Sequence, residues 1–334
     1  MALSTPVAFF IFNRPRLTQR VFDQIAHARP TVLFLIADGP RAPHPSDEEN
    51  CQAVRRIVDH VDWPCRVLKH YSETNLGLAE RITSGINWIF DHVEECIFLE
   101  DDCLPSASFF PFCEQLLERY RHDEQIMHIN GFSYQFGRVR TADSYYFSRI
   151  TCPWGWATWR HAWQHYDFRV RRWAELRETD WLRDILQHPR TVLFFQKGFD
   201  KAYRGELRSW DYQWTFACLS QSALSISPRD DLIMNLGHGP DATQTTWSGE
   251  EYNRPPAEMA FPLRHPACMV RNLAAEDCWI QYIAELCARA DARADAYSAA
   301  LKLYAWLPAP VRYSVRALLP QRLRSALVRW YLHG

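Results

Sequence analysis

Hydrophobic positions in the first 120 residues alternate between two patterns. Short continuous apolar runs, which are typical of buried strands, are followed by segments in which apolar residues recur every three or four positions, as at Leu17, Val21 and Ile25. The apolar runs cover residues 6–12, 31–37 and 96–99, and a further strand is predicted at residues 65–71. The helical segments follow Pro15 and cover residues 46–61, 78–92 and 106–120. This alternation predicts an α/β fold in which a mostly parallel, doubly wound, Rossmann-like sheet is flanked by helices.

The pattern becomes irregular after residue 120. Short strands are predicted at residues 126–129, 145–150 and 223–227, and helices at residues 180–187 and 191–203 and from residue 209. The segment Trp154–Arg160 is predicted to be an aromatic turn, and residues 241–266, rich in Pro, Thr, Gly and charge, to be a loop that becomes ordered on demand. No boundary is evident before about residue 270, so we divide the chain into a domain of residues 1–270 and a tail of residues 271–334.

The apolar run Cys96–Leu99 leads directly into three carboxylates, Glu100, Asp101 and Asp102. In an open α/β sheet, ligands bind beyond the carboxyl ends of the strands, which is where these acids would lie. Neighbouring carboxylates repel one another and are costly to desolvate unless a cation neutralises them. Mg2+ and Mn2+ bind one or two carboxylates and complete their coordination with substrate phosphates. A metal–diphosphate site is one interpretation, and an acidic turn or the charged first turn of the next helix is the other.

Composition and charge narrow the function classes. The formal net charge is −1, which gives no sign of nucleic-acid binding, and no strand–helix turn carries a glycine-rich phosphate loop. The ten cysteines include no CxxC pair, so we expect no zinc site, and we expect reduced thiols in the cytoplasm. The N-terminus lacks the pattern of a signal peptide, and no segment is long and apolar enough to span a bilayer. The 14 tryptophans suit sugar faces as well as cores.

Four sequence marks appear in order between residues 6 and 245. They are Phe12-Asn13-Arg14-Pro15, Asp38-Gly39, Glu100-Asp101-Asp102, and Trp154-Gly155-Trp156 followed by Trp210-Asp211. In this combination the chain resembles the GT-A class of nucleotide-sugar glycosyltransferases, and within it the inverting N-acetylglucosaminyltransferase I type and its bacterial relatives. The resemblance implies a GT-A domain, here with a C-terminal helical tail. The chain departs from that family in one respect. After Trp210-Asp211 it continues with Tyr212-Gln213-Trp214, whereas the family tends to repeat the acid at this point.

The resemblance implies a role for each member of the acidic triplet. A metal ion, Mn2+ or Mg2+, would bind to Asp102, the ribose would lie near Asp101, and the donor sugar near Glu100. The metal would neutralise the diphosphate and stabilise the departing UDP, so that no general acid is needed at the leaving group.

Other residues are implied to bind the UDP-sugar. Asp38 would accept a hydrogen bond from the uracil N3–H, Arg14 would lie near the base or the diphosphate, and Arg81 would reach the diphosphate. The alternatives are a turn-forming role for Asp38 and a solvated surface position for Arg81. Trp154 and Trp156 would stack on sugar rings of the donor or acceptor, with aromatic core packing as the alternative.

Inversion requires a base that deprotonates the acceptor hydroxyl. We predict that Asp211 is this base, because its neighbours Trp210 and Tyr212 form an apolar wall that can raise the carboxyl pKa toward the working pH. An ordinary helix N-cap is the alternative role for this acid. Glu206 and Asp200 are nearby candidates for the base.

Two further features lie toward the C-terminus. His238 is a candidate metal ligand, and Thr243 and Thr245 belong to a loop that could close over the diphosphate. Residues 297–334 contain no acid but have Lys and Arg interleaved with Leu, Trp and Tyr, which predicts short basic amphipathic helices at an anionic membrane surface. A helical lid with solvated arginines is the alternative.

Together these features predict a metal-dependent inverting glycosyltransferase of surface polysaccharide biosynthesis. It would transfer GlcNAc or a related hexose from a UDP-sugar to a glycan or lipid-linked glycan acceptor. It would act in the cytoplasm or peripherally at the cytoplasmic face of the inner membrane, and it would bind no nucleic acid. The alternatives are a sugar nucleotidyltransferase, which would normally carry a glycine-rich N-terminal loop, and a non-catalytic GT-A-like carbohydrate-binding protein.

Overall fold

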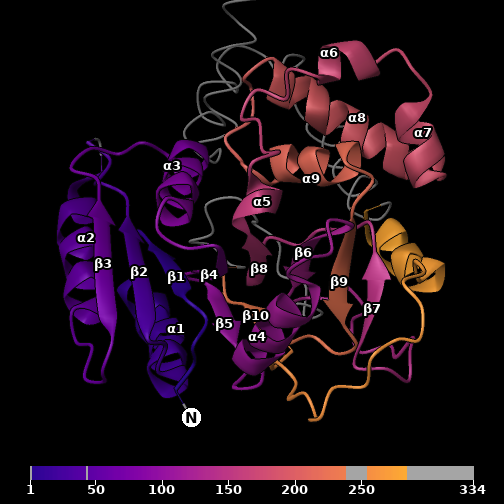
Figure 1. Cartoon of the computed structure of the whole chain (residues 1–334). Coiled ribbons are helices and arrows are strands. Elements are labelled where there is room, and N and C mark those ends of the chain that lie inside the picture. The colour runs from indigo at the N-terminus through magenta and orange to yellow at the C-terminus, as the bar shows by residue number, and fades with distance from the viewer. Residues whose placement is uncertain (1, 43, 238–253, 284–334) are drawn as a thin grey trace, which may run out of the picture. The chain divides into compact units, whose positions relative to one another are not determined.

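The computed structural model describes residues 2–42, 44–237 and 254–283 of the 334-residue chain (Figure 1). It divides into two compact units, residues 1–280 and 281–334. The first unit includes residues 271–280 because Glu276 accepts hydrogen bonds from the hydroxyl of Ser148 (3.2 Å) and the N–H of Arg149 (2.7 Å). Almost all of the second unit, with the predicted membrane helices of residues 297–334, lies outside the described residues.

An eight-stranded sheet forms the centre of the first unit. Its strands are β1 (Val7–Ile11), β2 (Val32–Ala37), β3 (Arg66–Tyr71), β4 (Glu95–Glu100), β6 (Ile126–Asn130), β7 (Tyr145–Ser148), β8 (Trp156–Trp159) and β9 (Leu224–Pro228). They follow the order β3-β2-β1-β4-β8-β6-β9-β7. The first four strands in this order are parallel to one another, as the strand–helix alternation predicted. The predicted α/β class with a mostly parallel sheet flanked by helices is confirmed.

The order of the strands reverses between β3 and β4. Strands β1, β2 and β3 follow one another toward one edge of the sheet, whereas β4 returns to the other side of β1. Open α/β sheets bind their ligands beyond the carboxyl ends of the strands at such a switch point. The segments that follow Ile11 and Glu100 meet at this place.

Helices cover both faces of the parallel half. They are α1 (Pro15–Ala28), α2 (Pro45–Val58) and α3 (Leu78–Phe90), and each turns its apolar residues at helical spacing toward the sheet. Alternate strand residues enter two separate cores. Val7 and Phe9 belong to the core that includes α1 and α2, and Ala8 and Phe10 to the core that includes α3. Burial on both faces explains why β1 and β2 are continuous apolar runs, whereas the edge strand β3 is only partly buried and carries Arg66 and Lys69.

The second half of the sheet mixes strand directions. Strand β8 is antiparallel to both β4 and β6, β6 is parallel to β9, and β7 is antiparallel to β9. The predicted aromatic turn at Trp154–Arg160 was wrong for most of its length, because Trp156–Trp159 is strand β8 in the interior of the sheet. All four residues of this strand are buried, and aromatic and β-branched residues suit such a position.

Helices α6 (Trp173–Leu176), α7 (Trp181–Leu186), α8 (Pro189–Tyr203) and α9 (Asp211–Ser220) lie at the upper right of Figure 1, and α5 (Arg160–Trp163) lies between α9 and strand β8. Helices α7 and α8 confirm the predictions for residues 180–187 and 191–203, and α9 confirms the helix predicted from residue 209.

The chain returns to the acidic triplet after β9. Strand β10 (Ile233–Asn235) pairs with β5 (Cys103–Pro105), which follows the triplet directly. The N–H of Leu236 donates to the carbonyl of Asp102 (2.7 Å). Part of the predicted loop 241–266 is also described, and its Glu258 accepts hydrogen bonds from N–H groups at the start of α4 (Phe109–Tyr120).

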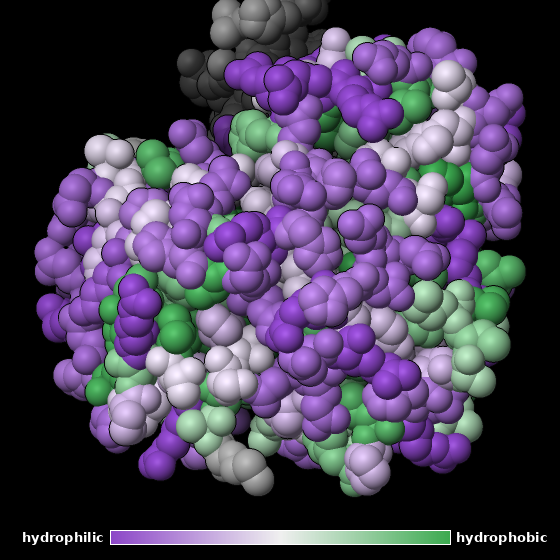
Figure 2. All heavy atoms as spheres, viewed as in Figure 1, coloured by the Kyte–Doolittle hydropathy of each residue, from purple (hydrophilic) through white to green (hydrophobic). Residues whose placement is uncertain are grey.

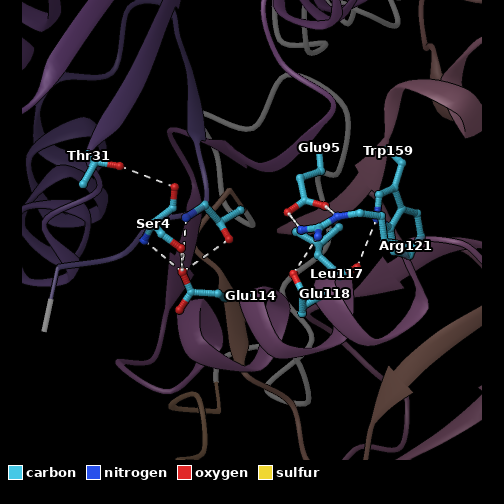
Figure 3. Close-up of polar contacts among 9 residues, drawn as sticks. Ser4, Thr31, Glu95, Glu114, Leu117, Glu118, Arg121 and Trp159 are labelled. Carbon is cyan, nitrogen blue, oxygen red and sulfur yellow. Dashed lines mark hydrogen bonds and ion pairs between the residues drawn. The ribbon is translucent and has the colours of Figure 1, made fainter.

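The amino ends of β1 and β4 are fixed by α4, as Figure 3 shows. Glu114 accepts hydrogen bonds from the N–H and the hydroxyl of Ser4 (2.8 and 2.6 Å). Arg121 pairs with Glu95 (2.8 Å) and Glu118 (2.7 Å). An open cavity of about 690 Å³ lies against these residues. Because its acids pair with Arg121 or hold the chain at Ser4, we assign this edge a structural role.

The face of the molecule in Figure 2 is largely hydrophilic. Green and pale green spheres gather at its right edge, over the segment drawn orange to yellow in Figure 1. The exposed large apolar side chains of that segment include Met269, Val270 and Leu273. Among the residues that the structure describes, no helix is long and apolar enough to cross a membrane.

Candidate active site

An arginine and the acidic triplet meet at the switch point between β1 and β4. Arg14 donates from Nη1 to Asp102 (2.9 Å) and from Nη2 to Asp101. The N–H of Phe12 also donates to Asp101 (3.3 Å). The side chain of Asp101 is 3% exposed and that of Asp102 15%. A guanidinium of the chain itself therefore supplies part of the positive charge that the acids require, which the sequence did not indicate.

Burial dominates the electrostatics of these residues. It raises the pKa of Asp101 to about 6, although the charge and hydrogen bonds of Arg14 oppose the shift. Burial, followed by the charges of Asp102 and Asp101, holds the pKa of Glu100 well above its ordinary value. For Arg14 itself, burial lowers the pKa, but the two carboxylates outweigh it and the pKa is raised. Three carboxyl groups face one guanidinium, so the site favours additional positive charge.

A network that the sequence analysis missed holds the segment Phe12-Asn13-Arg14. The side-chain amide of Asn13 donates to Asp47 (2.7 Å), which also accepts from Nε (2.6 Å) and Nη2 (3.0 Å) of Arg41. The hydrogen bonds of Arg41 lower the pKa of Asp47 to about 2 against the effect of burial. No local pattern marks this network, because Asp47 looks like an ordinary acid in the first turn of α2.

Asp38 follows β2 and is 6% exposed. Its carboxylate accepts hydrogen bonds from the N–H groups of Gly39, Leu76 and Gly77 and from the side-chain amide of Asn75, at 2.9–3.0 Å. These bonds correspond to the turn-forming alternative. The uracil contact, for which one of them would have to be exchanged, stays a prediction.

Arg81 is buried, with 5% of its surface exposed. Its Nη2 lies 2.9 Å from Nδ1 of His70 and donates to the carbonyl of the same residue (3.1 Å). Burial lowers the pKa of Arg81, and the charge of Asp38 opposes this shift. The surface alternative for Arg81 was wrong, and its contact with a diphosphate stays a prediction.

The two tryptophans of the Trp154-Gly155-Trp156 segment differ in environment. Trp156 is 2% exposed and stacks on Phe98 at 4.6 Å and on Trp210 at 5.3 Å between ring centres. The prediction that this ring stacks on a sugar was wrong, because neighbouring rings cover it and core packing describes it. Trp154 is half-buried and lies 5.1 Å from the ring of Phe132. Its sugar contact stays a prediction.

Asp211 is the first residue of α9, and Trp210 occupies the N-cap position before it. Burial raises the pKa of Asp211 to about 6, against the effect of hydrogen bonds that its carboxylate accepts from the N–H groups of Asp211 and Tyr212. The charge of Asp211 contributes to the raised pKa of Glu100. The fold therefore brings the predicted base within electrostatic range of the acidic triplet, although the two are far apart in the sequence.

The other two candidates for the base are engaged elsewhere. Glu206 is exposed and pairs with Arg204 (2.7 Å). Asp200 accepts a hydrogen bond from the indole N–H of Trp173 (3.0 Å). These contacts leave Asp211 as the candidate that the electrostatics connect to Glu100.

The donor set for a metal ion is small. Within the described ranges, no group of three or more His, Cys, Asp and Glu side chains could hold a metal. Asp102 fits a site in which a hard cation takes one carboxylate and substrate phosphates supply other ligands. Gly237 passes so close to this carboxylate that a Cβ there would overlap it. The candidate ligand His238 and the loop residues Thr243 and Thr245 lie outside the described residues.

No protein-family model matches the chain, and no curated protein matches it. Among solved structures it is similar to a mannosyltransferase, PcManGT from Pyrobaculum calidifontis in complex with GDP-Man and Mn2+, at 14% identity and a TM-score of 0.37, over 66% of this chain and 74% of that one. It is also similar to a UDP-glucose pyrophosphorylase complexed with UDP-glucose, at 11% identity and a TM-score of 0.30, over 48% of this chain and 78% of that one. Neither is named as an N-acetylglucosaminyltransferase. Likeness at this level assigns no family or activity, so the function has to be argued from the site.

Proposed function

We propose that this protein is a metal-dependent inverting glycosyltransferase of the GT-A class with a UDP-sugar as donor. The observation that carries the proposal is the cluster of Arg14, Asp101 and Asp102 at the switch point, with Asp211 in electrostatic range. This is the place where an open α/β sheet binds its ligand. An excess of buried acid there suits a divalent cation and a diphosphate.

Residues of the first half of the sheet would act on the leaving group. Asp102 would hold Mn2+ or Mg2+, which when bound supplies positive charge for the diphosphate. Arg14, already oriented by Asp101 and Asp102, would donate hydrogen bonds to the departing phosphate oxygens. Positive charge at this position replaces a general acid. Glu100 would face the donor sugar and Asp101 the ribose.

Asp211 would activate the acceptor. With a pKa of about 6, its carboxyl is ionised near neutral pH and is still more basic than an ordinary aspartate. The acceptor hydroxyl gives its proton to Asp211 while its oxygen forms a bond to the anomeric carbon. The bond from that carbon to the diphosphate breaks, and its electron pair leaves with UDP. Attack from the opposite side inverts the anomeric configuration.

The resemblance supplies the finer parts of the proposal. GlcNAc or a related hexose is the donor sugar, and a glycan or lipid-linked glycan of surface polysaccharide biosynthesis is the acceptor. The half-buried ring of Trp154 offers a surface for one of the sugars.

The basic tail is proposed to bind an anionic membrane surface. Removal of residues 297–334 should therefore weaken binding to anionic vesicles, by roughly 1 kcal/mol per basic residue at the surface. Equal vesicle binding with and without the tail at low salt would contradict the membrane proposal.

Calorimetry with UDP, with and without Mn2+, tests the metal–diphosphate part of the proposal. The parent protein should bind UDP about 10- to 100-fold more tightly in Mn2+ than in EDTA. In Asp102→Ala, the affinity for UDP should not depend on Mn2+. Asp200→Ala is the matched control, since this acid is bonded to Trp173. Identical UDP affinities in all these conditions would refute the metal site.

Product analysis separates the alternatives. A glycosyltransferase releases UDP from a UDP-sugar and is faster when the acceptor is present. A sugar nucleotidyltransferase instead forms pyrophosphate from UTP and a sugar 1-phosphate. A carbohydrate-binding protein does neither, and its affinity for sugars would not depend on Asp102.

A further inference from the structure

A hydrogen-bond chain ties the start of α9 to α3. The hydroxyl of Tyr166, which follows α5, donates to the carbonyl of Trp210 (3.4 Å). The same oxygen lies 3.1 Å from the hydroxyl of Thr83 in α3 and accepts its hydrogen bond in this arrangement. Trp210 immediately precedes Asp211, so this chain ends on the peptide group that carries the proposed base.

The ring of Tyr166 is itself held in place. It stacks on Trp163 with 4.2 Å between ring centres and 12° between ring planes. The indole N–H of Trp163 donates to the side chain of Asn87 (2.8 Å). Thr83 and Asn87 are four residues apart in α3 and therefore lie on the same face of that helix. Tyr166 thus has two supports on α3, one through its hydroxyl and one through the ring beneath it.

Stacked rings connect the same peptide group to the strand of the acids. Trp156 stacks on Phe98 of β4 and on Trp210, at 4.6 and 5.3 Å between ring centres. Phe98 comes two residues before Glu100 in the same strand. Rings packed in this way have defined separations, so the spacing between the end of β4 and the start of α9 is set on one side by this stack.

We propose that Tyr166 is a positioning residue, whose hydroxyl holds Asp211 at its working distance from the end of β4. The inference rests on the proposed function, in which Asp211 is the base. A displacement of about 1 Å in a catalytic group lowers turnover by up to about 10²-fold. The stack on Trp156 contacts the ring of Trp210, whereas the bond from Tyr166 contacts the carbonyl of Trp210, in the peptide group that leads into Asp211.

The test combines two substitutions and a control. Tyr166→Phe removes the hydroxyl and keeps the ring on Trp163. It should lower turnover of the UDP-sugar about tenfold and leave the affinity for UDP with Mn2+ unchanged. In the Asp211→Asn background, the same substitution should cause no further loss, because it acts through Asp211. Tyr146→Phe is the matched control, since it also removes a hydroxyl bonded to a carbonyl (Ser133, 3.0 Å).

The possible outcomes separate this inference from the proposed function. Full turnover in Tyr166→Phe, or an equal fold loss in both backgrounds, would overturn the positioning role. Near-normal turnover in Asp211→Asn would instead contradict the assignment of the base.

A carboxyl titration by 13C NMR tests the positioning role of Tyr166 even where no UDP-sugar is turned over. The groups whose ionisation is coupled to Asp211 are Glu100 at the end of β4, Cys152 before β8 and Tyr166 itself. Removal of the hydroxyl should admit water to the first turn of α9 and lower the pKa of Asp211 by about half a unit. An unchanged pKa of Asp211 in Tyr166→Phe would overturn the inference.

Discussion

The two halves of the sheet contribute to the site in different ways. In the half β3-β2-β1-β4, the polar residues follow strand ends directly and are held by ion pairs and backbone hydrogen bonds, as Asp101 is by Arg14 and Phe12. In the half β8-β6-β9-β7, the residue of interest is Asp211, and rings from several elements hold the helix that carries it. In the proposed function, the first half therefore binds the nucleotide, and the second half positions one carboxylate next to it.

This difference indicates which substitutions should change nucleotide affinity and which should change turnover. Changes at the ends of β1 and β4 remove charge that a diphosphate or metal would meet, so they should alter nucleotide affinity. Changes under α9 leave that charge in place and move the proposed base, so they should alter turnover first. Four experiments test this division, and they are ordered by decreasing size of the expected change.

The largest effect is expected for Asp211→Asn. The side chain keeps its size and most of its hydrogen bonding but cannot take a proton, so turnover should fall by about 10²–10⁴-fold. Affinity for UDP with Mn2+ should be unchanged, because in the proposed function the other half binds the nucleotide. Steady-state kinetics and calorimetry measure the two quantities. Unchanged turnover with unchanged thermal stability would show that Asp211 only helps to start the helix.

Substitution of Arg14 by methionine should weaken both the fold and the nucleotide site. Asp101, which is 3% exposed, would lose its counterion, at a cost of about 3 kcal/mol in the free energy of unfolding. Mn2+ should restore part of this stability, and it should stabilise Arg14→Met more than the parent protein. Denaturant unfolding with and without Mn2+ measures this, with the exposed Arg16→Met as control. Equal effects of Mn2+ on both proteins would mean that no metal binds beside Arg14.

Acid should stabilise the metal-free protein through Asp211. Its pKa is about 6 in the fold against an ordinary value near 3.8, so the folded state binds the proton more tightly. This contribution is fully present below about pH 4 and is lost as the pH rises through about 6. Between pH 7.5 and 5, the gain in unfolding free energy should therefore be about 1.4 kcal/mol smaller in Asp211→Asn than in the parent.

The control for this pH experiment is Glu206→Gln. The pKa of Glu206 is lowered by its hydrogen bonds with Arg204, so this acid is ionised in both folded and unfolded states above pH 5. Burial lowers the pKa of His128 to about 3, which favours the fold as the pH rises toward 6.5, but this contribution is common to all the variants and cancels. A parallel pH response of Asp211→Asn and the parent would show that Asp211 has an ordinary pKa.

The smallest effects are expected for a matched pair of glycines, one in each half. A Cβ at Gly198 in α8 would overlap the ring of Tyr212, next to Asp211, and a Cβ at Gly85 in α3 would lie 2.7 Å from the ring of Phe10. Each substitution by alanine should lower stability by about 1–2 kcal/mol through overpacking. Only Gly198→Ala should also lower turnover, by a few-fold. Equal turnover in the two variants at equal stability would contradict the proposed division of roles between the two halves of the sheet.

Much of the parallel half was predictable because its signals are local. Continuous apolar runs, amphipathic spacing and a strand that ends in three acids all lie within a few residues of one another, and hydrophobic burial acts on them directly. The Trp156–Trp159 strand shows where this reasoning stops. Four residues are too short a pattern to separate a turn from an interior strand, and only pairing with β4 and β6 selects the strand.

Local sequence patterns were enough to predict the class of the fold and the position of the acidic triplet at the end of a buried strand. The folded chain was needed to show that Arg14 neutralises Asp101 and Asp102, that Trp156 packs in the core, and that Asp211 lies in electrostatic range of Glu100. The two groups of features differ in the range of the interactions behind them. Strand and helix propensity act between near neighbours, whereas ion pairing, ring stacking and desolvation depend on which distant segments the fold brings together.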